Sequence, residues 1–491
     1  MRSYWHTPVS TLVGIAACAA TAFGQLPQGF VEKTIATKAV FTEATSMAHA
    51  DDGRIFVSER GGTIKLIKGD SAVLVYKINT TIEREQGLLK IQAHPGFAGK
   101  SWLYCYYMTA DLNHHNISRL VLDQNSTVTR VDTVVKLPVL ENQGRHNGSG
   151  MVFGKDGFLY VSRGNDEIGG AANPAGLWTS QKGKILRFTD EGLPAPGNPH
   201  YGNAGATDAE KSIWARGFRN PWTLAYDPYS GRILEGDVGD GTEEINDVTK
   251  PDAAKDYWYG YGVGGGDGVN AGGKKNTIDP IYYHATGFQG ECAVVAEVPY
   301  SADRPSNWPA EYKNKIYIAD YCGNSIKMVS LDAPAAPTDI NAAGSGMKVF
   351  YDDSQKKVGL YVGLDGNLYY VAYGANQKAY EIYNTAPASL QKERAASPGM
   401  ILDNLVFTAG RISDVSFTLR GESASAEAAQ AVFSVLSADG RVQFQQAAPF
   451  NGANFRLSGF KPASAGIFIC QLSWNAQGTA RRALGRMVVL P

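Results

Sequence analysis

The chain has 491 residues, which is enough for roughly two to four domains of ordinary size. It contains 55 Gly and 22 Pro, while 44% of its residues are hydrophobic and only 19% are charged, a composition that excludes a disordered or collagen-like protein. The 46 basic and 47 acidic side chains leave a net charge of −1, which excludes a dedicated nucleic-acid-binding protein. Together with 11% aromatic residues, the many turn-forming residues favour a large β-rich globular protein.

The chain begins with a segment typical of an export signal, predicted over residues 1–24. Arg2 gives a weak positive start, residues 11–23 are apolar and small, and Ala22-Phe23-Gly24 matches the small-x-small pattern of a cleavage site. Cys18 also fits a bacterial lipoprotein signal, and a buried first strand or helix is a further alternative. No other stretch reaches the ~18 apolar residues of a membrane-spanning helix. We therefore expect a secreted or cell-surface protein, with the periplasm or a lipoprotein of the outer membrane as lesser alternatives.

A pair of short strands with one pattern recurs six times through the middle of the chain. A turn and a strand of β-branched and aromatic residues occupy residues 52–57, 100–104, 156–161, 230–234, 313–318 and 365–370. Partner strands of alternating apolar residues occupy residues 63–66, 117–120, 184–187, 244–248, 325–328 and 379–382. One pair cannot bury its own faces, whereas six repeated sheets bury them by closing into a ring. The repeat predicts an all-β fold with a six-bladed β-propeller over residues 25–385; an array of β-sandwiches is the alternative.

Export would place the cysteines in an oxidising compartment. No two of those that follow residue 24 form a C-x2-C pair, which excludes a zinc site built on that spacing. Cys292 and Cys322 lie on either side of one predicted hairpin, which is compatible with a disulfide between them. Cys105 and Cys470 lie within predicted strands, where we expect buried thiols.

The C-terminal part of the chain is predicted to be a separate domain. Residues 386–398 are rich in Ala, Pro and Ser and resemble a linker. Residues 387–491 hold ten basic and six acidic side chains, against 35 basic and 41 acidic ones in residues 25–386. Alternating strands at residues 415–419 and 432–436 predict a small β-sandwich over residues 399–491.

Three polar clusters are candidates for chemistry. The first is the glycine-rich loop 144–150, in which His146 could act as a general base because its ordinary pKa lies near neutrality. The second contains Arg219 and Asn220 before a proline, where a guanidinium group could hold a carboxylate or polarise a carbonyl oxygen. The third is the acidic stretch 235–244, which fits a Ca²⁺ site of oxygen ligands or, alternatively, a solvated acidic turn.

With these clusters in place, the chain resembles the glucose/sorbosone dehydrogenase family over nearly all of residues 27–383. The motifs that carry the resemblance are those at residues 26–30, 47–62, 85–89, 93–97, 146–148, 183–187, 219–222, 243–246 and 319–322. The family comprises secreted six-bladed propellers and includes the soluble quinoprotein sugar dehydrogenases, in which pyrroloquinoline quinone (PQQ) lies over the central channel.

The resemblance implies a PQQ-dependent oxidoreductase that oxidises an aldose at its anomeric carbon and passes electrons to an external acceptor. His146 would remove the proton of the anomeric hydroxyl group, while hydride passes to the quinone. Arg219 would assist this transfer by polarising the quinone. The residues placed on the cofactor by resemblance are Glu85, Asp166, Arg219, Asn220 and Lys378. The residues placed on Ca²⁺ are Gly239, Asp240, Glu243 and Glu244.

Several residues depart from the family pattern. Arg145 precedes the histidine, residues 293–295 lack the aromatic side chain that covers the cofactor in the sugar dehydrogenases, and Lys378 is the single late basic candidate for the cofactor's carboxylates. The spacing of Cys292 and Cys322 looks closer to the hedgehog-interacting-protein-like branch. The alternative function is therefore a non-catalytic propeller that binds carbohydrate or protein.

The last domain shows a second resemblance. Residues 437–442, 455–458, 464–469 and 486–490 are similar to the C-terminal sorting domain of type IX secretion. This resemblance implies a Gram-negative source and delivery to the surface or the medium by that secretion machinery. An accessory β-sandwich that binds surface carbohydrate is the alternative.

Overall fold

The structure is a computed structural model. It describes residues 26–385, apart from 112–113, 141–143, 170–171, 258–276, 288–290, 305 and 354, and eight strands between residues 400 and 490. The predicted signal peptide 1–24 and the predicted linker 386–398 lie outside the described residues. In the part of the chain that is described, no helix has the length and apolar character needed to cross a membrane.

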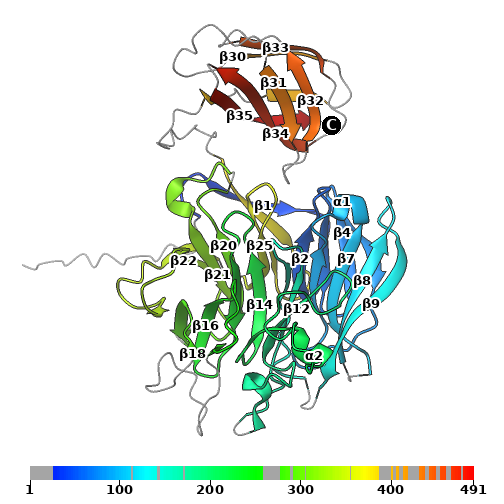
Figure 1. Ribbon diagram of the computed structural model, residues 1–491, viewed down its shortest axis with the longest axis vertical. Coiled ribbons are helices and arrows are strands. Elements are labelled where there is room, and N and C mark those ends of the chain that lie inside the picture. The colour runs from blue at the N-terminus through cyan, green and yellow to red at the C-terminus, as the bar shows by residue number, and fades with distance from the viewer. Residues whose placement is uncertain are drawn as a thin grey trace, which may run out of the picture.

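Six antiparallel sheets form a six-bladed β-propeller, coloured from blue to yellow in Figure 1. Blade 1 contains β2 (Ala44–His49), β3 (Ile55–Glu59), β4 (Thr63–Lys68) and β5 (Ser71–Lys77). Blade 2 contains β6 (Leu88–Ala93), β7 (Trp102–Met108), β8 (His114–Leu122) and β9 (Val128–Val139). Blade 3 contains β10 (Met151–Phe153), β11 (Leu159–Arg163), β12 (Lys184–Phe188) and β13 (Ile213–Arg216).

The second half of the ring departs from four consecutive strands per blade, because blade 4 has a fifth strand and blade 6 includes β1 (Phe30–Ile35). Blade 4 contains β14 (Pro221–Tyr226), β15 (Ile233–Asp237), β16 (Thr242–Asp247) and β19 (Tyr282–Ala285), extended by the parallel strand β23 (Thr338–Asp339). Blade 5 contains β20 (Val294–Tyr300), β21 (Lys315–Asp320), β22 (Ser325–Ser330) and β24 (Lys348–Asp352). Blade 6 contains β25 (Lys357–Val362), β26 (Leu368–Ala372), β27 (Ala379–Asn384) and β1 (Phe30–Ile35). Short elements between them are α1 (Phe97–Lys100), α2 (Asp208–Lys211), two 3₁₀ turns (Pro174–Gly176 and Ala310–Tyr312) and the parallel pair β17 (Asp256–Tyr257) and β18 (Thr277–Ile278).

The first strands of the blades form a closed ring around the central channel. Around this ring the neighbours are β2, β6, β10, β14, β20 and β25, and β25 lies against β2. The apolar core is divided among the spaces between adjacent blades; Phe56 and Leu66 of blade 1, for example, pack with Leu103 and Leu120 of blade 2. All six predicted strand pairs are confirmed as the second and third strands of the six blades, from β3 and β4 to β26 and β27.

The ring is closed by a strand from the start of the chain. β1 pairs antiparallel with β27, so that Phe30 lies opposite Asn384 and Ile35 opposite Ala379. In Figure 1 the blue strand β1 accordingly lies among the yellow strands of blade 6. The Phe30 ring packs at 4.8 Å from both Trp308 and Tyr312 (centroid to centroid), which fixes β1 to blades 5 and 6.

Shortening Phe30 is expected to weaken this closure. Because the ring is 7% exposed, Phe30→Ala should lower the free energy of unfolding by about 3–5 kcal/mol. Urea denaturation followed by tryptophan fluorescence measures the loss. The control is Val31→Ala on the same strand, where the side chain is 37% exposed and the loss should stay below about 1 kcal/mol. Equal losses in the two variants would contradict the closing role of Phe30.

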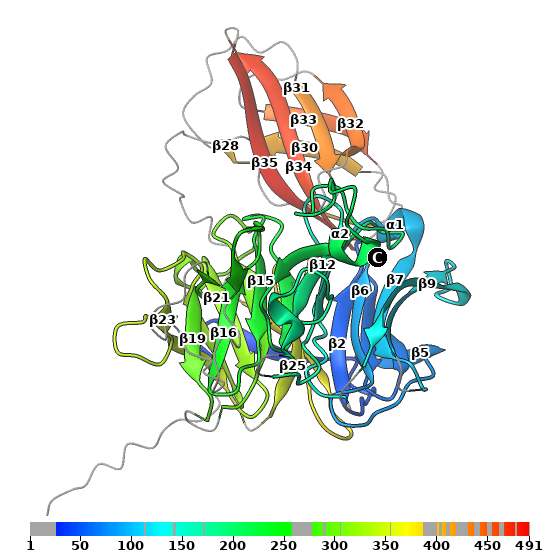
Figure 2. The same cartoon turned by 60° about the horizontal axis from the view of Figure 1, so that its bottom comes forward.

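The C-terminal part contains two further sheets, coloured orange to red in Figure 2. Its strands are β28 (Met400–Ile401), β29 (Leu405–Thr408), β30 (Ser413–Thr418), β31 (Ala431–Leu436), β32 (Val442–Ala448), β33 (Asn454–Phe460), β34 (Gly466–Ala476) and β35 (Thr479–Leu490). The larger sheet has the order β28-β35-β34-β31-β32, with β29 also on β35, and β30 pairs with β33. Two sheets are what a β-sandwich requires, and the boundaries at residues 386, 398 and 399 stay predictions.

Candidate active site

A cavity of about 340 Å³ lies in the central channel. Its wall is built by the first strands β2, β6, β14, β20 and β25 and by the loops at one end of them. Glu85 and Asn220, two predicted cofactor residues, line this cavity. A concave, mostly apolar site with a few convergent polar groups is the usual form of a small-molecule binding site.

His146 lies on the loop that leads into β10; Ser149 of this loop lines the cavity, and the His146 side chain is not among the lining residues. It is 6% exposed and has a left-handed backbone with φ of 49°. Its Nδ1 lies 2.9 Å from Oδ1 of Asn165. The same oxygen accepts from the Glu167 N–H group at 3.0 Å, and Nδ2 of Asn165 donates to the carbonyl oxygen of Ile168 at 3.2 Å. These partners fix the orientation of the amide, so Nδ1 carries the proton and Nε2 keeps its lone pair.

The environment keeps His146 neutral. Burial, followed by the positive charge of Arg219, lowers the pKa of the imidazole to about 4. Hydrogen bonding to Asn165 and the negative charges of Glu167 and Asp240 act in the opposite direction. At neutral pH the ring is therefore a neutral imidazole with one oriented basic nitrogen, which is the form that a general base requires.

The backbone of the His146 loop is held from behind by Arg163 of β11. Nη1 of Arg163 donates to the carbonyl oxygens of His146 at 3.3 Å, Asn147 at 3.4 Å and Gly164 at 3.0 Å. Gly164 is required at this place, because a Cβ atom there would lie 1.9 Å from the carbonyl oxygen of His146. The loop is therefore fixed by hydrogen bonds and close packing and not by the glycines' freedom alone.

Asp166 does not lie where the resemblance placed it. The residue is fully buried, its carboxylate pairs with Arg163, and Oδ2 lies 2.9 Å from Nζ of Lys182. Its side chain is absent from the cavity wall. We therefore correct its predicted cofactor contact to a positioning role, because the carboxylate neutralises the guanidinium group that holds the His146 loop. The residue that does contact the imidazole is its neighbour, Asn165.

Arg219 and Asn220 are joined to the same site through Asp237 of β15. The carboxylate of Asp237 accepts from the Arg219 N–H group at 2.9 Å and from the Asn220 N–H group at 2.6 Å. The Arg219 carbonyl oxygen accepts from Asn165 N–H at 2.9 Å. Nη1 of Arg219 donates to the carbonyl oxygens of Val238 at 2.7 Å and Gly239 at 2.9 Å. The guanidinium group thus supplies positive charge beside His146 from a fixed position.

Glu85 and Asn220 connect the His146 loop to the cavity. Oδ1 of Asn220 accepts from the Gly148 N–H group at 3.0 Å, and Nδ2 lies 3.3 Å from Oε2 of Glu85. Burial raises the pKa of Glu85, while backbone hydrogen bonds from Asn147 and His146 and the charge of Arg219 oppose the rise. Two residues that the sequence suggested for cofactor contact therefore meet each other at the cavity wall.

The structure does not bring the four predicted calcium ligands together. Glu243 and Glu244 follow each other on β16, so their side chains point to opposite faces of the sheet. The oxygens of Glu243 accept from Thr286 at 3.0 Å and from the backbone of Val294 at 3.0 Å, and burial raises its pKa to about 8. In residues 26–385 as described, no three carboxylates gather tightly enough to share an ion.

The turn at Gly239 and Asp240 holds the guanidinium group of Arg219, whose Nη1 donates to the Gly239 carbonyl oxygen at 2.9 Å. Asp240 is 74% exposed, and its Oδ1 lies 3.5 Å from Nη2 of Arg219. Backbone carbonyl oxygens and a carboxylate are the hard donors that Ca²⁺ prefers. The structure separates Glu243 and Glu244 from this turn, and calcium binding at Gly239 and Asp240 stays a prediction.

Lys378 also lies elsewhere than expected. Its ammonium group donates to the backbone carbonyl oxygens of Thr37 at 2.8 Å and Ala39 at 2.5 Å, and the side chain does not reach the cavity wall. This lysine holds the segment that follows β1 and is not placed to pair with a ligand in the cavity, so its predicted cofactor contact is corrected.

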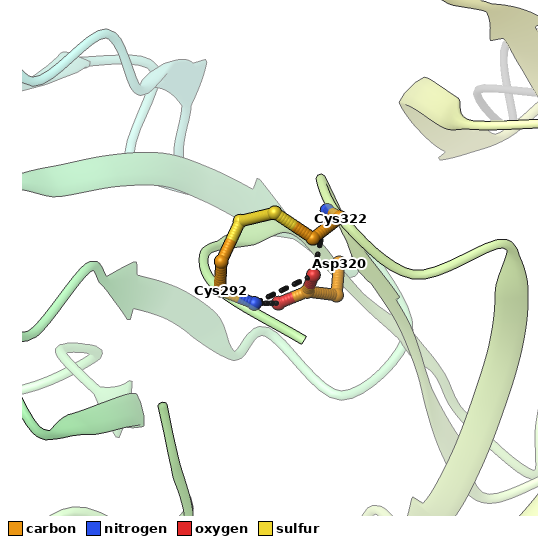
Figure 3. Close-up of side chains that lie close together, drawn as sticks. All are labelled: Cys292, Asp320 and Cys322. Atoms are coloured by element: carbon orange, nitrogen blue, oxygen red, sulfur yellow. Dashed lines mark hydrogen bonds between the residues drawn. A yellow bond between two sulfur atoms is a disulfide. The ribbon is translucent and has the colours of Figure 1, made fainter. Parts of the chain in front are cut away.

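The predicted disulfide between Cys292 and Cys322 is confirmed, with Cα atoms 5.5 Å apart. Figure 3 shows Asp320 beside it. The Asp320 carboxylate accepts from the backbone N–H groups of Cys292, Ala293, Cys322 and Gly323 at 2.8–3.1 Å. Ala293 and Tyr321 both line the cavity, so this bridge fixes one side of its wall. Cys105 is a buried free thiol, as expected, and the side chain of Cys470 lies outside the described residues.

Several lining residues were not predicted. They are the cations Arg60, Arg84 and Lys90 and the rings of Trp222, Tyr321 and Tyr373. Tyr321 and Tyr373 come from blades 5 and 6 and meet edge to face, with centroids 5.3 Å apart. The one local signal was Lys90, the single charged residue of β6. The rings lie far apart in the sequence, with Trp222 on β14 and the two tyrosines directly after β21 and β26.

Comparisons with known proteins place this site in context. A family model described as Glucose / Sorbosone dehydrogenase matches residues 41–372. An uncharacterised protein of Synechocystis, slr1608, is 27% identical over 230 residues, which cover 42% of this chain and 54% of that protein. The chain thus spans about half the length of that relative. The aldose sugar dehydrogenase YliI of Escherichia coli is 24% identical over 341 residues, covering 65% of this chain and 84% of the enzyme.

A solved structure supports the fold. The chain is similar to the PQQ-bound aldose sugar dehydrogenase of Streptomyces coelicolor, with a TM-score of 0.56 and 22% identity over 73% of this chain and 99% of the other. At this identity the likeness establishes the six-bladed architecture and leaves the chemistry to be argued from the residues described above.

Proposed function

Because the chain belongs to the glucose/sorbosone dehydrogenase family, we propose that it is a PQQ-dependent aldose dehydrogenase that oxidises its substrate at the anomeric carbon. The observation that carries this proposal is the neutral, oriented imidazole of His146, on a loop whose backbone bonds to Glu85 and Asn220 of the cavity wall. The E. coli relative, which bears the name of an aldose sugar dehydrogenase, supports the substrate class. An external acceptor would take the electrons from the protein.

The cavity fits such a cofactor. PQQ is a planar aromatic quinone that carries carboxylate groups, and the wall offers Arg60, Arg84 and Lys90 as cations. Trp222 and the Tyr321–Tyr373 pair add ring surfaces, which the sequence at residues 293–295 did not offer. When bound, PQQ supplies a two-electron acceptor. Ca²⁺ would be held at the Gly239–Asp240 turn.

In the proposed reaction, the protein accepts the proton of the anomeric hydroxyl group and holds the imidazole ring that accepts it in a fixed orientation. His146 accepts the proton of the anomeric hydroxyl group at Nε2, while Asn165 holds the ring through Nδ1. Arg219 keeps the imidazole neutral before the reaction and adds positive potential at the site. Arg163 and Asp166 fix the loop on which His146 stands.

The direct test adds PQQ and Ca²⁺ to the purified apoprotein and follows aldose-dependent reduction of a dye. We expect turnover with at least one aldose, and loss of turnover when a chelator removes Ca²⁺. No turnover with a broad panel of sugars, together with no change in quinone absorbance on mixing, would instead favour the alternative of a non-catalytic binding propeller.

Replacing Asn165 with aspartate should move the acid limb of the pH–rate profile. A carboxylate against Nδ1 favours the protonated imidazole, so the pKa of His146 should rise from about 4 by about one to three units. On acidification, kcat/KM of the variant should therefore fall at a higher pH than kcat/KM of the wild-type protein. The measurement is kcat/KM for the best aldose between pH 3.5 and 9. The control is Asn173→Asp, since Asn173 caps the turn at Ala175 and does not contact His146; an unmoved limb in Asn165→Asp would contradict the contact.

We further propose that the protein is exported by its first 24 residues and sorted through residues 399–491. The apolar signal pattern and the two-sheet C-terminal part support this proposal. N-terminal sequencing of protein from the culture medium should begin at Gln25. A lipid-modified N-terminus at Cys18 would favour the lipoprotein alternative, and unchanged release after deletion of residues 399–491 would contradict sorting by type IX secretion.

A further inference from the structure

Lys90 places an amino group in the wall of the channel cavity. It lies on β6 between Leu89 and Ile91, and its side chain lines the channel together with Leu89. Across the described residues, its ammonium group has neither a hydrogen bond nor an ion pair within 4 Å. Taking an ammonium group out of water costs several kcal/mol unless an anion compensates it, so such a residue needs a reason.

The opposite wall carries one carboxyl group, that of Glu297, which interacts electrostatically with Lys90 but forms no ion pair with it within 4 Å. Glu297 lies on β20 of blade 5, which stands across the ring from β6 of blade 2. Its Oε2 accepts a hydrogen bond from the hydroxyl group of Thr223, and Oε1 is buried with no partner in the described part of the chain. Burial raises the pKa of Glu297 to about 8 and lowers the pKa of Lys90, and the charge of each group partly opposes the shift of the other. Lys90 and Glu297 thus line the cavity as two desolvated groups, and no hydrogen bond or ion pair within 4 Å joins them in the described part of the chain.

The remaining charges of the wall have the same sign or are already engaged. Glu85, the other carboxyl group of the cavity, accepts hydrogen bonds from the backbone and from Asn220, and burial raises its pKa. Arg60 is paired with Glu43 at 3.6 Å, and Arg84 adds a further positive charge to the wall. Because the lining exposes more apolar than polar surface, an anion in this cavity would interact with Lys90 at a lower dielectric than in water.

We propose that Lys90 is a ligand-binding residue that pairs with a carboxylate group of the molecule that fills the channel cavity. The inference rests on the proposed function in one respect, which is that PQQ is that molecule. It takes the place of the contact that the sequence assigned to Lys378, whose ammonium group is bound to Thr37 and Ala39.

The experiment measures binding to the apoprotein, with no turnover involved. Dissociation constants are obtained by equilibrium dialysis for PQQ, for its trimethyl ester and for benzene-1,3,5-tricarboxylate. Lys90→Met should weaken PQQ binding about tenfold to a hundredfold and leave binding of the uncharged ester unchanged. Lys90→Arg should retain most of the affinity. The control is Lys136→Met, which removes an exposed lysine from β9 of the same blade.

Each result decides the inference. Equal PQQ affinity in Lys90→Met and wild-type protein, or an equal loss for PQQ and its ester, would overturn it. If the wild-type protein binds no PQQ, the proposed function fails, and the tricarboxylate then tests Lys90 alone: lost binding in Lys90→Met supports the anion site and unchanged or absent binding refutes it. Thermal melting shows whether Lys90→Met is folded; removal of a desolvated charge should leave its midpoint unchanged or higher.

Discussion

Replacement of His146 should abolish most of the sugar oxidation while leaving the propeller intact. General base catalysis by a positioned imidazole contributes about 10²–10⁴-fold, so kcat should fall by about that factor. His146→Asn is the sharper variant, because asparagine tolerates the left-handed backbone of this position, whereas His146→Ala also adds backbone strain. Dye-linked turnover at saturating sugar measures the loss, and circular dichroism checks the fold.

If His146 is the general base, the activity of the wild-type protein should depend on the protonation of its imidazole. His146 accepts a proton only when neutral, so kcat/KM should be constant well above pH 4 and fall as the pH drops through about 4. His200→Ala is the matched control, since that ring stacks on Trp178 outside the cavity and should leave turnover unchanged. Unchanged turnover in His146→Asn would refute the assignment of the base.

Asp166→Asn is expected to lower the free energy of unfolding as strongly as Phe30→Ala. The carboxylate is fully buried between Arg163 and Lys182, and its loss would leave two cations uncompensated in the interior. Breaking a buried ion pair in this way costs about 3–5 kcal/mol. Because Arg163 also holds the carbonyl oxygen of His146, the variant should lose activity before it unfolds. Urea denaturation and activity at increasing urea concentration measure the two effects.

The control for this variant is Asp70→Asn. Asp70 pairs with Lys38 on the surface, where both side chains are more than half exposed, so the change should cost less than about 1 kcal/mol. If Asp166→Asn instead kept its stability and lost only its affinity for PQQ, Asp166 would face the cofactor after all, as the resemblance implied.

The blades could be predicted because their middle strands form local hairpins. β3 and β4, for example, are joined by a short turn; β3 is a run of β-branched and aromatic residues, and β4 shows the alternation of a half-buried strand. The first strands were harder to identify, since both of their faces are covered. β10 is only three residues long and wholly buried, so it shows no period from which a strand could be inferred.

The site could be predicted where one motif supplies both the residue and its surroundings. His146, Arg219 and Asn220 were found because their loops carry glycine or proline next to a functional group, and the structure joins them through Asn165 and Asp237. The sequence did not show which of two adjacent residues, Asn165 or Asp166, contacts the imidazole of His146.

Asn165 and Asp166 are adjacent, but the first side chain reaches the imidazole and the second turns into a buried ion pair. Lys378 was the wrong cation for a related reason. The sequence does not show which basic side chain reaches the channel and which one donates hydrogen bonds to backbone carbonyl oxygens instead. The carbonyl oxygens of Thr37 and Ala39, which occupy Lys378, come from the other end of the propeller sequence.

The pairing of β1 with β27 imposes an order on folding. Within the propeller, the strand that completes blade 6 is synthesised first and its partner at residues 379–384 is synthesised last. Five blades can therefore form while the circle is still open, and the final step brings together segments at maximal separation, which makes it slow. A ligand that requires the complete circle binds only after this step and shifts the equilibrium towards it. Loading of the cofactor and closure of the ring should thus stabilise each other, with the channel remaining unformed in any intermediate that lacks β1.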